Sequence, residues 1–272
     1  MIEFLKKLLS DDGKSVPLDC ASTSETGLVR AENQDSVLVR EDADVYCVAD
    51  GMGGGDGGAV ASALMCRAVD KEVVSSLDLQ GRMKAMAAAV HEANAEIQDY
   101  ALKAGYRQMA TTVAMMALRL DDEPTAVIGH IGDSRVYRCR AGKLSALTAD
   151  HTVAAEINRR SAAAGKDEVV TGRLTHVLTR AVGIGDVEAE WKKVDVEPGD
   201  VFMLCSDGVY DMVPDGRIEE VLATASSAKA AVDRLSELIV AAGAEDNYTF
   251  VVIRVGTVAA QNGKDAKDAQ AS

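Results

Sequence analysis

Five aspartates stand where predicted β-strands begin, end or turn. Two follow apolar runs, two stand at or just before the start of such runs, and one lies in a GDS turn: Asp50, Asp207, Asp35, Asp246 and Asp133. In an antiparallel sheet, the start of one strand lies beside the end of its neighbour. We therefore expect these carboxylates to gather at one edge of a sheet, although they are far apart in the sequence.

Carboxylates that gather in this way repel one another unless a cation lies between them. Oxygen ligands without histidine or cysteine partners favour Mg²⁺ or Mn²⁺ over zinc. The loop GMGGGDGG follows Asp50, and Gly51 has no side chain that would keep a metal ion from its carbonyl group. The alternative for each aspartate alone is ordinary turn chemistry, because its side chain accepts hydrogen bonds from nearby backbone N–H groups.

Other uses of a glycine-rich loop are poorly supported. A P-loop needs the GK[ST] residues that hold phosphate and Mg²⁺, and none follow here. A GxGxxG dinucleotide-binding pattern can be fitted to this loop, but glycine-rich sequences fit many patterns, so this match is weak evidence for a dinucleotide site.

The composition limits the classes of partner and compartment. A formal net charge of −14 argues against binding to nucleic acid or anionic lipid, since both need a basic face. The five cysteines include no CxxC pair, which is typical of reduced thiols in a cytoplasmic protein. No stretch approaches the length of a transmembrane helix. We expect a cytoplasmic protein that binds no nucleic acid and has no transmembrane segment.

Periodicity predicts the elements that must position the aspartates. Strands are expected over 18–23, 36–39, 44–49, 111–120, 125–131, 135–140, 189–194, 201–205 and 248–255, and helices over 57–74, 81–104, 217–225 and 228–242. The stretch 150–172 begins as a helix and ends irregularly. Blocks of strands followed by helices fit one α+β domain with layered sheets.

Both ends of the chain are expected to lie outside that domain. Residues 1–16 form an amphipathic extension that is too short to span a membrane, and we expect it to pack onto the domain at 17–257. The alternatives are a docking helix and a weak surface anchor. Residues 258–272 are polar and are predicted to be disordered.

Eight motifs occur in order from about residue 20 to 256: RAENQD (30–35), VADGMGG (48–54), MATTV (109–113), GDSRVY (132–137), LTADHT (147–152), LTRAVG (178–183), CSDGVYD (205–211) and DNYT (246–249). Together they resemble the metal-dependent protein serine/threonine phosphatases of type 2C, the PPM family, in its bacterial form. The resemblance implies a four-layer α+β sandwich of two stacked, mostly antiparallel sheets flanked by helices.

The resemblance also implies two Mn²⁺ or Mg²⁺ ions at one end of the sandwich. Asp50 matches the ligand that bridges both ions, and Gly51 matches the residue that offers its carbonyl group to one of them. Asp207 and Asp246 match the remaining core ligands, and Asp35 matches an aspartate beside them. A hydroxide that bridges two such ions would attack phosphorus in line.

Further matched residues concern a possible third ion and the substrate. Asp133, with Asp207, matches the ligands of a third ion in bacterial members. Arg30 matches the arginine that holds the substrate phosphate, which its planar guanidinium can bind through two oxygens. Residues at about 152–175 correspond to a flap that shapes access for the substrate.

One departure leaves the proton donor for the leaving group unassigned. Animal members have a histidine where this chain has Met52, whereas methionine is common in the bacterial branch. A metal-bound water is one candidate donor, and His176 near the flap is the only histidine that we would test as an acid.

The predicted activity is hydrolysis of phosphoserine and phosphothreonine in proteins that a serine/threonine kinase has modified, by a monomeric enzyme. One alternative is the related branch that dephosphorylates anti-anti-sigma regulators, which usually carries additional sensor domains. The other is a catalytically inactive scaffold that binds phosphoproteins. Loss of a metal-binding aspartate would favour the scaffold, and every matched aspartate is present.

Overall fold

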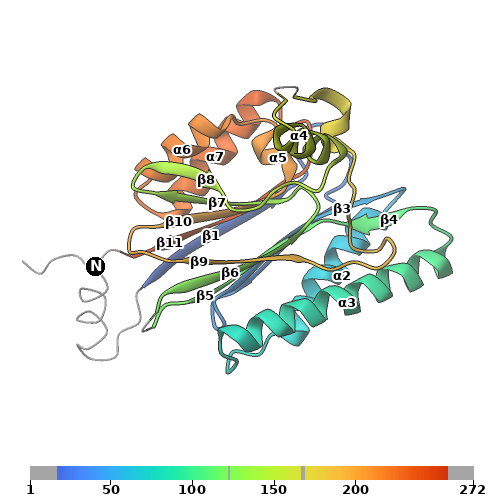
Figure 1. Cartoon of the computed structure of the whole chain (residues 1–272), viewed down its shortest axis with the longest axis horizontal. Helices are drawn as coiled ribbons and strands as arrows, with labels where there is room; N and C mark the ends of the chain where they lie inside the picture. Colours follow the sequence, from blue (N-terminus) through green and yellow to red (C-terminus); the bar gives the residue numbers. More distant parts are fainter. Residues whose placement is uncertain (1–16, 122, 167–168, 257–272) are drawn as a thin grey trace, which may run out of the picture.

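Two antiparallel β-sheets lie face to face in the middle of the protein (Figure 1). The first sheet joins, in spatial order, β1 (Leu18–Glu25), β11 (Tyr248–Val255), β10 (Val201–Cys205), β7 (Arg135–Arg140) and β8 (Lys143–Ala146). The second joins β2 (Asp35–Arg40), β3 (Val45–Gly53), β5 (Val113–Arg119), β6 (Thr125–Ile131) and β9 (Glu190–Asp195), and β4 (Met109–Thr111) pairs with β3. This computed structural model describes residues 17–121, 123–166 and 169–256.

Helices cover the outer face of each sheet, which gives the predicted four layers (Figure 1). Helices α2 (Gly57–Glu72) and α3 (Leu79–Ala104) lie against the second sheet. Helices α6 (Asp215–Thr224) and α7 (Ala228–Ala242) lie against the first sheet. The α+β sandwich expected from the motifs is therefore confirmed.

Successive side chains of a strand point to opposite faces of its sheet, and this alternation produces three separate apolar layers. On β3, Tyr46 and Val48 face the other sheet, whereas Val45, Cys47 and Ala49 face α2 and α3. The central layer lies between the two sheets, and one further layer lies under each pair of helices. Because β3, β5, β6, β10 and β11 are buried on both faces, these strands read as apolar runs with little polar alternation.

The structure differs from the predicted elements in a few places. The expected strand over 111–120 is interrupted at Thr112, whose backbone N–H donates to the carbonyl oxygen of Asp50. Strand β8 and the short helix α5 (Asp207–Tyr210) were not predicted, because both are only four residues long and have no clear period. The flap region contains α4 (Val153–Ala163) and a 3-10 helix, η1 (Gly172–His176).

The expectations for the two ends of the chain, an amphipathic extension at 1–16 and a disordered tail at 258–272, lie outside the described residues. The proposed domain boundaries therefore stay predictions. Within the described ranges, no helix combines the length and the apolar character needed to cross a bilayer.

Packing between the sheets should dominate the stability of the fold. Phe202 on β10 is fully buried in the central layer. We expect Phe202→Ala to lower the free energy of unfolding by about 3–5 kcal/mol, because it leaves a cavity between two sheets that cannot collapse easily. Urea denaturation measures this change. The control Leu102→Ala, on the exposed face of α3, should change stability by less than about 0.5 kcal/mol; equal effects would contradict this view of the core.

Candidate metal centre

The register of the strands brings the predicted aspartates to one end of the sandwich. Asp35 begins β2 and pairs directly with Asp50 on β3. In the other sheet, Asp207 follows the end of β10, and Asp246 precedes the start of β11, its neighbour. Asp133 lies in the turn between β6 and β7. The carboxylates of Asp35, Asp50, Asp133, Asp207 and Asp246 all enter one network of mutual repulsion.

Burial and mutual repulsion raise the pKa of four of these carboxyl groups. Burial, with added repulsion from Asp207 and Asp246, raises the pKa of Asp35 to about 7. Burial and then repulsion from Asp207 and Asp150 raise the pKa of Asp133 to about 7. The pKa values of Asp50 and Asp207 are raised for the same reasons. A bound cation would relieve this repulsion and favour the charged forms.

Ser206 holds the buried carboxylate of Asp35. Its hydroxyl donates to Oδ2 of Asp35 at 2.8 Å and accepts the backbone N–H of Thr249 at 3.0 Å. The hydroxyl thus ties β2 of one sheet to β10 and β11 of the other. Sequence reasoning missed this role, although Ser206 stands beside Asp207 in the CSDGVYD motif.

Thr112 links Asp50 to the turn that carries Asp133. The backbone N–H of Asp50 donates to Oγ1 of Thr112 at 3.0 Å, and Oγ1 lies 2.6 Å from Oγ of Ser134. At the interruption between β4 and β5, the Thr112 hydroxyl faces the backbone N–H of Asp50 and so helps to hold Asp50 in place. Thr112 belongs to the MATTV motif that the sequence analysis singled out, but the sequence did not show where the hydroxyl groups of this motif point.

The Asp133 turn is also held from two other sides. The Tyr210 hydroxyl donates to the Asp133 backbone carbonyl at 3.0 Å, and the guanidinium of Arg135 lies 3.5 Å from the centre of the Tyr210 ring. The His151 backbone N–H donates to the Gly132 carbonyl at 2.9 Å, and the Gly132 N–H donates to Nδ1 of His151 at 3.1 Å. These contacts hold the backbone of the turn that carries the Asp133 side chain.

The glycines of two Asp-Gly pairs stand where another part of the backbone packs too closely for a side chain. A Cβ atom on Gly51 would lie 2.0 Å from the carbonyl oxygen of Gly58, and one on Gly208 would lie 2.0 Å from that of Asn247. No side chain fits at either position. The glycine loop therefore folds back onto β3 directly beside Asp50, a reason for Gly51 that adds to the expectation about its carbonyl group.

Arg30 lies at the rim of the centre. Its Nη2 donates to Oδ2 of Asp246 at 2.6 Å, and its side chain stays 55% exposed. A guanidinium that binds a carboxylate offers the same N–H donors that a phosphate oxygen accepts. Its position thus suits the predicted role of binding a phosphate next to the metal ligands.

A further group of potential ligands was not predicted from the sequence. His176, at the end of η1, Asp207 and Asp211 each offer one atom, and these atoms lie within 4.8 Å of one another. His176 therefore reaches the centre from the flap, as its sequence position suggested, and Asp211 joins it through the last residue of CSDGVYD.

The group His130, His151 and Glu190 has similar spacing but suits a cation poorly. Because Nδ1 of His151 accepts the Gly132 N–H, its Nε2 carries the proton, which points to Oε2 of Glu190 at 3.3 Å. Nε2 of His130 lies 2.9 Å from the Ala149 carbonyl oxygen. The group is a hydrogen-bonded support for the Gly132 turn.

The aspartate cluster does fit hard divalent cations. Its donors are carboxylate oxygens from five aspartates, and the five cysteines are free. Such oxygen-rich sets suit Mg²⁺ and Mn²⁺.

Comparisons with known proteins agree with this arrangement. A sequence model of the protein phosphatase 2C family matches residues 29–245. The serine/threonine phosphatase stp of Listeria innocua is 31% identical over 253 residues, a match that covers 89% of this chain and 97% of that protein. The structure of PppA, a key regulatory component of T6SS in Pseudomonas aeruginosa, has a TM-score of 0.79 at 32% identity and covers 89% and 99% of the two chains. The catalytic domain of the serine/threonine protein phosphatase PstP, in complex with two manganese ions, has a TM-score of 0.74 at 33% identity, covering 88% and 99%.

The raised pKa values predict how the metal-free protein responds to pH. Asp35 and Asp133 have an ordinary pKa of 3.8 and a folded-state pKa of about 7. The folded state therefore binds more protons than the unfolded state between these values, and the stability that this gives is lost as the pH rises through 7. In EDTA, the free energy of unfolding should fall from pH 5 to pH 8, as measured by urea denaturation.

Asp35→Asn is the matched control for this titration. It keeps the size of the side chain and removes one of the repelling charges, so its stability should fall less steeply over the same range. A wild-type curve that stays flat or rises in EDTA would contradict the crowding of carboxylates at this end of the sandwich.

Proposed function

The chain belongs to the protein phosphatase 2C family, and we propose on this premise that it hydrolyses phosphoserine and phosphothreonine in proteins with the help of divalent metal ions. The observation that carries the proposal is the cluster of aspartates with raised pKa values beside an arginine at the rim. The two manganese ions in the related PstP domain support the same requirement for metal.

We propose that the core ions are Mn²⁺ or Mg²⁺. Asp50 would bridge the two core ions, with Asp207, Asp246 and the Gly51 carbonyl group as further ligands and Asp35 beside them. The direct pairing of Asp35 with Asp50, held in place by Ser206, supports this assignment. A third ion would be held by Asp133 and Asp207, whose carboxylates repel each other.

Different residues of the chain would have different roles in the hydrolysis of a phosphoryl group. When bound, divalent ions supply the Lewis acidity that makes phosphorus open to attack by water. Arg30 would bind phosphate oxygens through its fork of N–H donors and orient the group. Thr112, Ser206 and Tyr210 would keep the metal-binding aspartates in place through the contacts described above.

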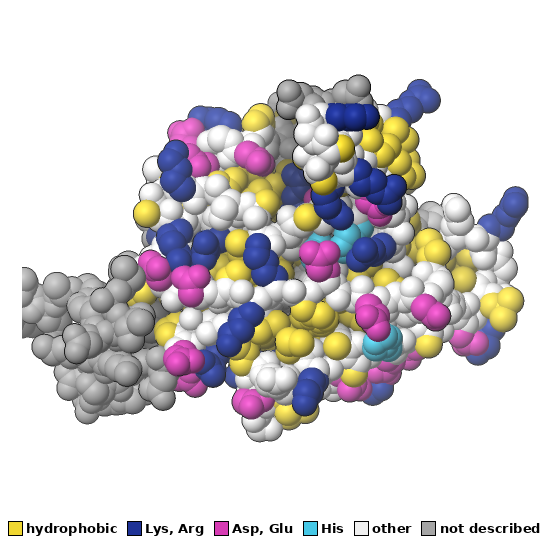
Figure 2. Space-filling model, in the orientation of Figure 1, with side chains coloured by type: hydrophobic (Ala, Val, Ile, Leu, Met, Phe, Trp, Pro, Cys, Tyr) yellow, Lys and Arg dark blue, Asp and Glu magenta, His cyan; other side chains and the backbone are white. Residues whose placement is uncertain are grey.

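The charge near the centre favours a phosphorylated partner. Although the whole chain has a formal net charge of −14, Lys and Arg side chains gather over the region of α4 (Figure 2). The exposed basic residues of this region include Arg159, Arg160, Arg173 and Arg180. A local positive field of this kind attracts anionic partners.

The oligomeric state, the compartment and the role in signalling are also part of the proposal. We propose that the protein acts as a monomer in the cytoplasm and, in signalling, reverses the action of a serine/threonine kinase. Its five free cysteines suit a reducing compartment. An inactive scaffold would not need the full set of aspartates, so the arrangement of the centre favours the enzyme.

Phosphate release from a phosphothreonine peptide tests the activity. Turnover should require Mn²⁺ or Mg²⁺ and disappear with excess EDTA, and Asp207→Asn should abolish it because a ligand of two ions is lost. Asp99→Asn, an exposed aspartate on α3, serves as the control and should keep full activity. A folded Asp207→Asn protein with unimpaired turnover would refute the metal assignment.

Arg30→Ala tests the binding of phosphate. The loss of charged hydrogen bonds worth about 1.5–3 kcal/mol should raise KM about 10- to 150-fold, with a smaller effect on kcat. Arg67→Ala, which removes a similarly exposed arginine that pairs with Glu96, should leave both constants unchanged. A fall in kcat alone would count against this role of Arg30.

A further inference from the structure

A cleft of about 490 Å³ lies beside the candidate metal centre. One wall is formed by the start of the glycine loop, at residues 52–54, and the other by the segment 176–184 at the end of the flap region. The lining residues that matter here are Met52, Ala110, His176, Val177, Ala181 and Ile184.

The lining of this cleft is mainly apolar, unlike the metal centre. Met52, Ala110 and Ala181 contribute to its walls, and two large aliphatic side chains stand at its surface. Val177 is 45% exposed and Ile184 is 55% exposed. Exposed aliphatic side chains around a hollow mark a surface that gains free energy when a partner covers it.

The cleft is continuous with the metal centre. Met52 and Gly53 directly follow Asp50 and Gly51, and His176 offers a ligand atom within 4.8 Å of one from Asp207. An extended peptide advances about 3.3–3.6 Å per residue. A peptide whose phosphorylated residue is at the metal centre therefore has residues within reach of the cleft.

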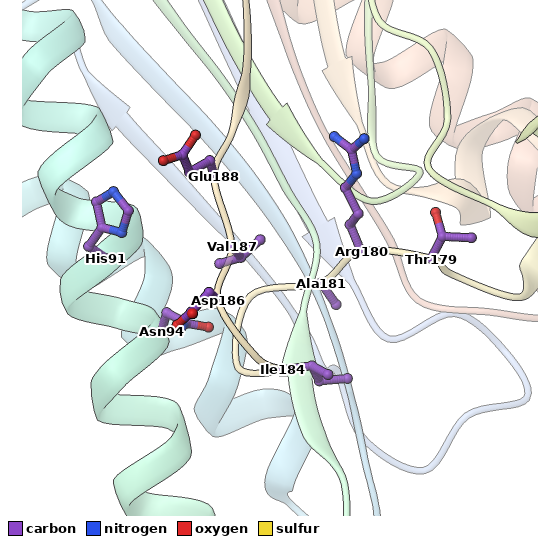
Figure 3. Close-up of a pocket in the computed structure, with 9 residues that line it drawn as sticks. All are labelled: His91, Asn94, Thr179, Arg180, Ala181, Ile184, Asp186, Val187 and Glu188. Atoms are coloured by element: carbon purple, nitrogen blue, oxygen red, sulfur yellow. The ribbon is translucent and has the colours of Figure 1, made fainter.

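The turn that carries Ile184 is held in place before any partner binds. The Gly183 N–H donates to Oδ1 of Asn94 at 2.7 Å, and Nδ2 of Asn94 donates to the Gly185 carbonyl at 2.9 Å. Both glycines have positive φ angles, 104° and 63°. The buried Asn94 side chain on α3 thus fixes the backbone of the turn, and Ile184 points away from α3 (Figure 3).

The hollow on the other side of this turn has a different character. It measures about 660 Å³ and shares Thr179, Arg180, Ala181 and Ile184 with the cleft. Its remaining lining includes His91 and Glu188, which Figure 3 shows on the same side of the view, with the Glu188 carboxylate toward His91. Charged and polar groups lining this second hollow make it a poor place for an aliphatic side chain, so the apolar cleft is the better site.

We propose that the cleft binds an aliphatic side chain of the substrate protein that lies within three residues of the phosphorylated serine or threonine. This inference rests on the proposed phosphatase activity and names its preferred substrate class. Ile184 and Val177 cover the aliphatic side chain, and Ile184 is the specificity-determining residue because its turn is anchored to α3.

A series of phosphothreonine peptides tests this preference. The peptides are identical except for a single leucine, which replaces a serine at each position from three residues before to three residues after the phosphothreonine. At one or more positions, leucine should raise kcat/KM about five- to tenfold over the all-serine peptide, as expected for partial burial of a leucine side chain.

Two variants then locate the site of this preference. Ile184→Asp should reduce the ratio of leucine-peptide to serine-peptide kcat/KM to about one. Val240→Asp, which changes a similarly exposed aliphatic residue on α7, should keep the wild-type ratio. A wild-type enzyme without preference, or an unchanged ratio in Ile184→Asp, overturns the inference.

A small substrate separates this result from failure of the proposed function. With Mn²⁺, the wild-type protein should hydrolyse p-nitrophenyl phosphate, which has no flanking residues. Turnover of this ester without any preference among the peptides overturns the role of the cleft alone. No turnover of either substrate overturns the proposed function together with the inference.

Discussion

Repulsion among buried carboxylates is the constraint on which this end of the molecule depends. The pKa values of Asp35, Asp50, Asp133 and Asp207 are all raised by burial and by one another's charge. Arg30 is the cation that pairs with this cluster among the described residues, and it does so at the exposed edge through Asp246. Such an arrangement is unfavourable by itself and becomes favourable with divalent cations in place. This crowding therefore supports the proposed metal site.

The two sheets create this crowding through their register. Asp35 and Asp50 are paired across β2 and β3, and the neighbouring strands β10 and β11 bring Asp207 and Asp246 to the same end. A hydroxyl group then joins the sheets, since Ser206 donates to Asp35. Within the second sheet, the Thr112 hydroxyl accepts the N–H of Asp50. Packing of apolar layers keeps the sheets stacked, and this stacking keeps the carboxylates together against their repulsion.

Much of this arrangement could be predicted from the sequence. Strands β6, β7, β10 and β11 and helix α7 match the predicted ranges, because long apolar or amphipathic runs determine them. Hydroxyl contacts such as Ser206 with Asp35 could not be predicted, since they join residues 171 positions apart and depend on rotamers. The break at Thr112 was missed because the run 111–120 is apolar throughout most of its length. The cleft beside Ile184 needed the structure, since it forms between distant segments.

Anomalous X-ray diffraction from crystals grown with Mn²⁺ would show whether the aspartate cluster binds metal ions. Data collected at the manganese absorption edge locate the ions without any assumption about activity. We expect two strong anomalous peaks on either side of the Asp50 carboxylate, within bonding distance of Asp207 or Asp246. Manganese found only at other positions, such as His130 and Glu190, or no ordered peak beside Asp50, would contradict this expectation.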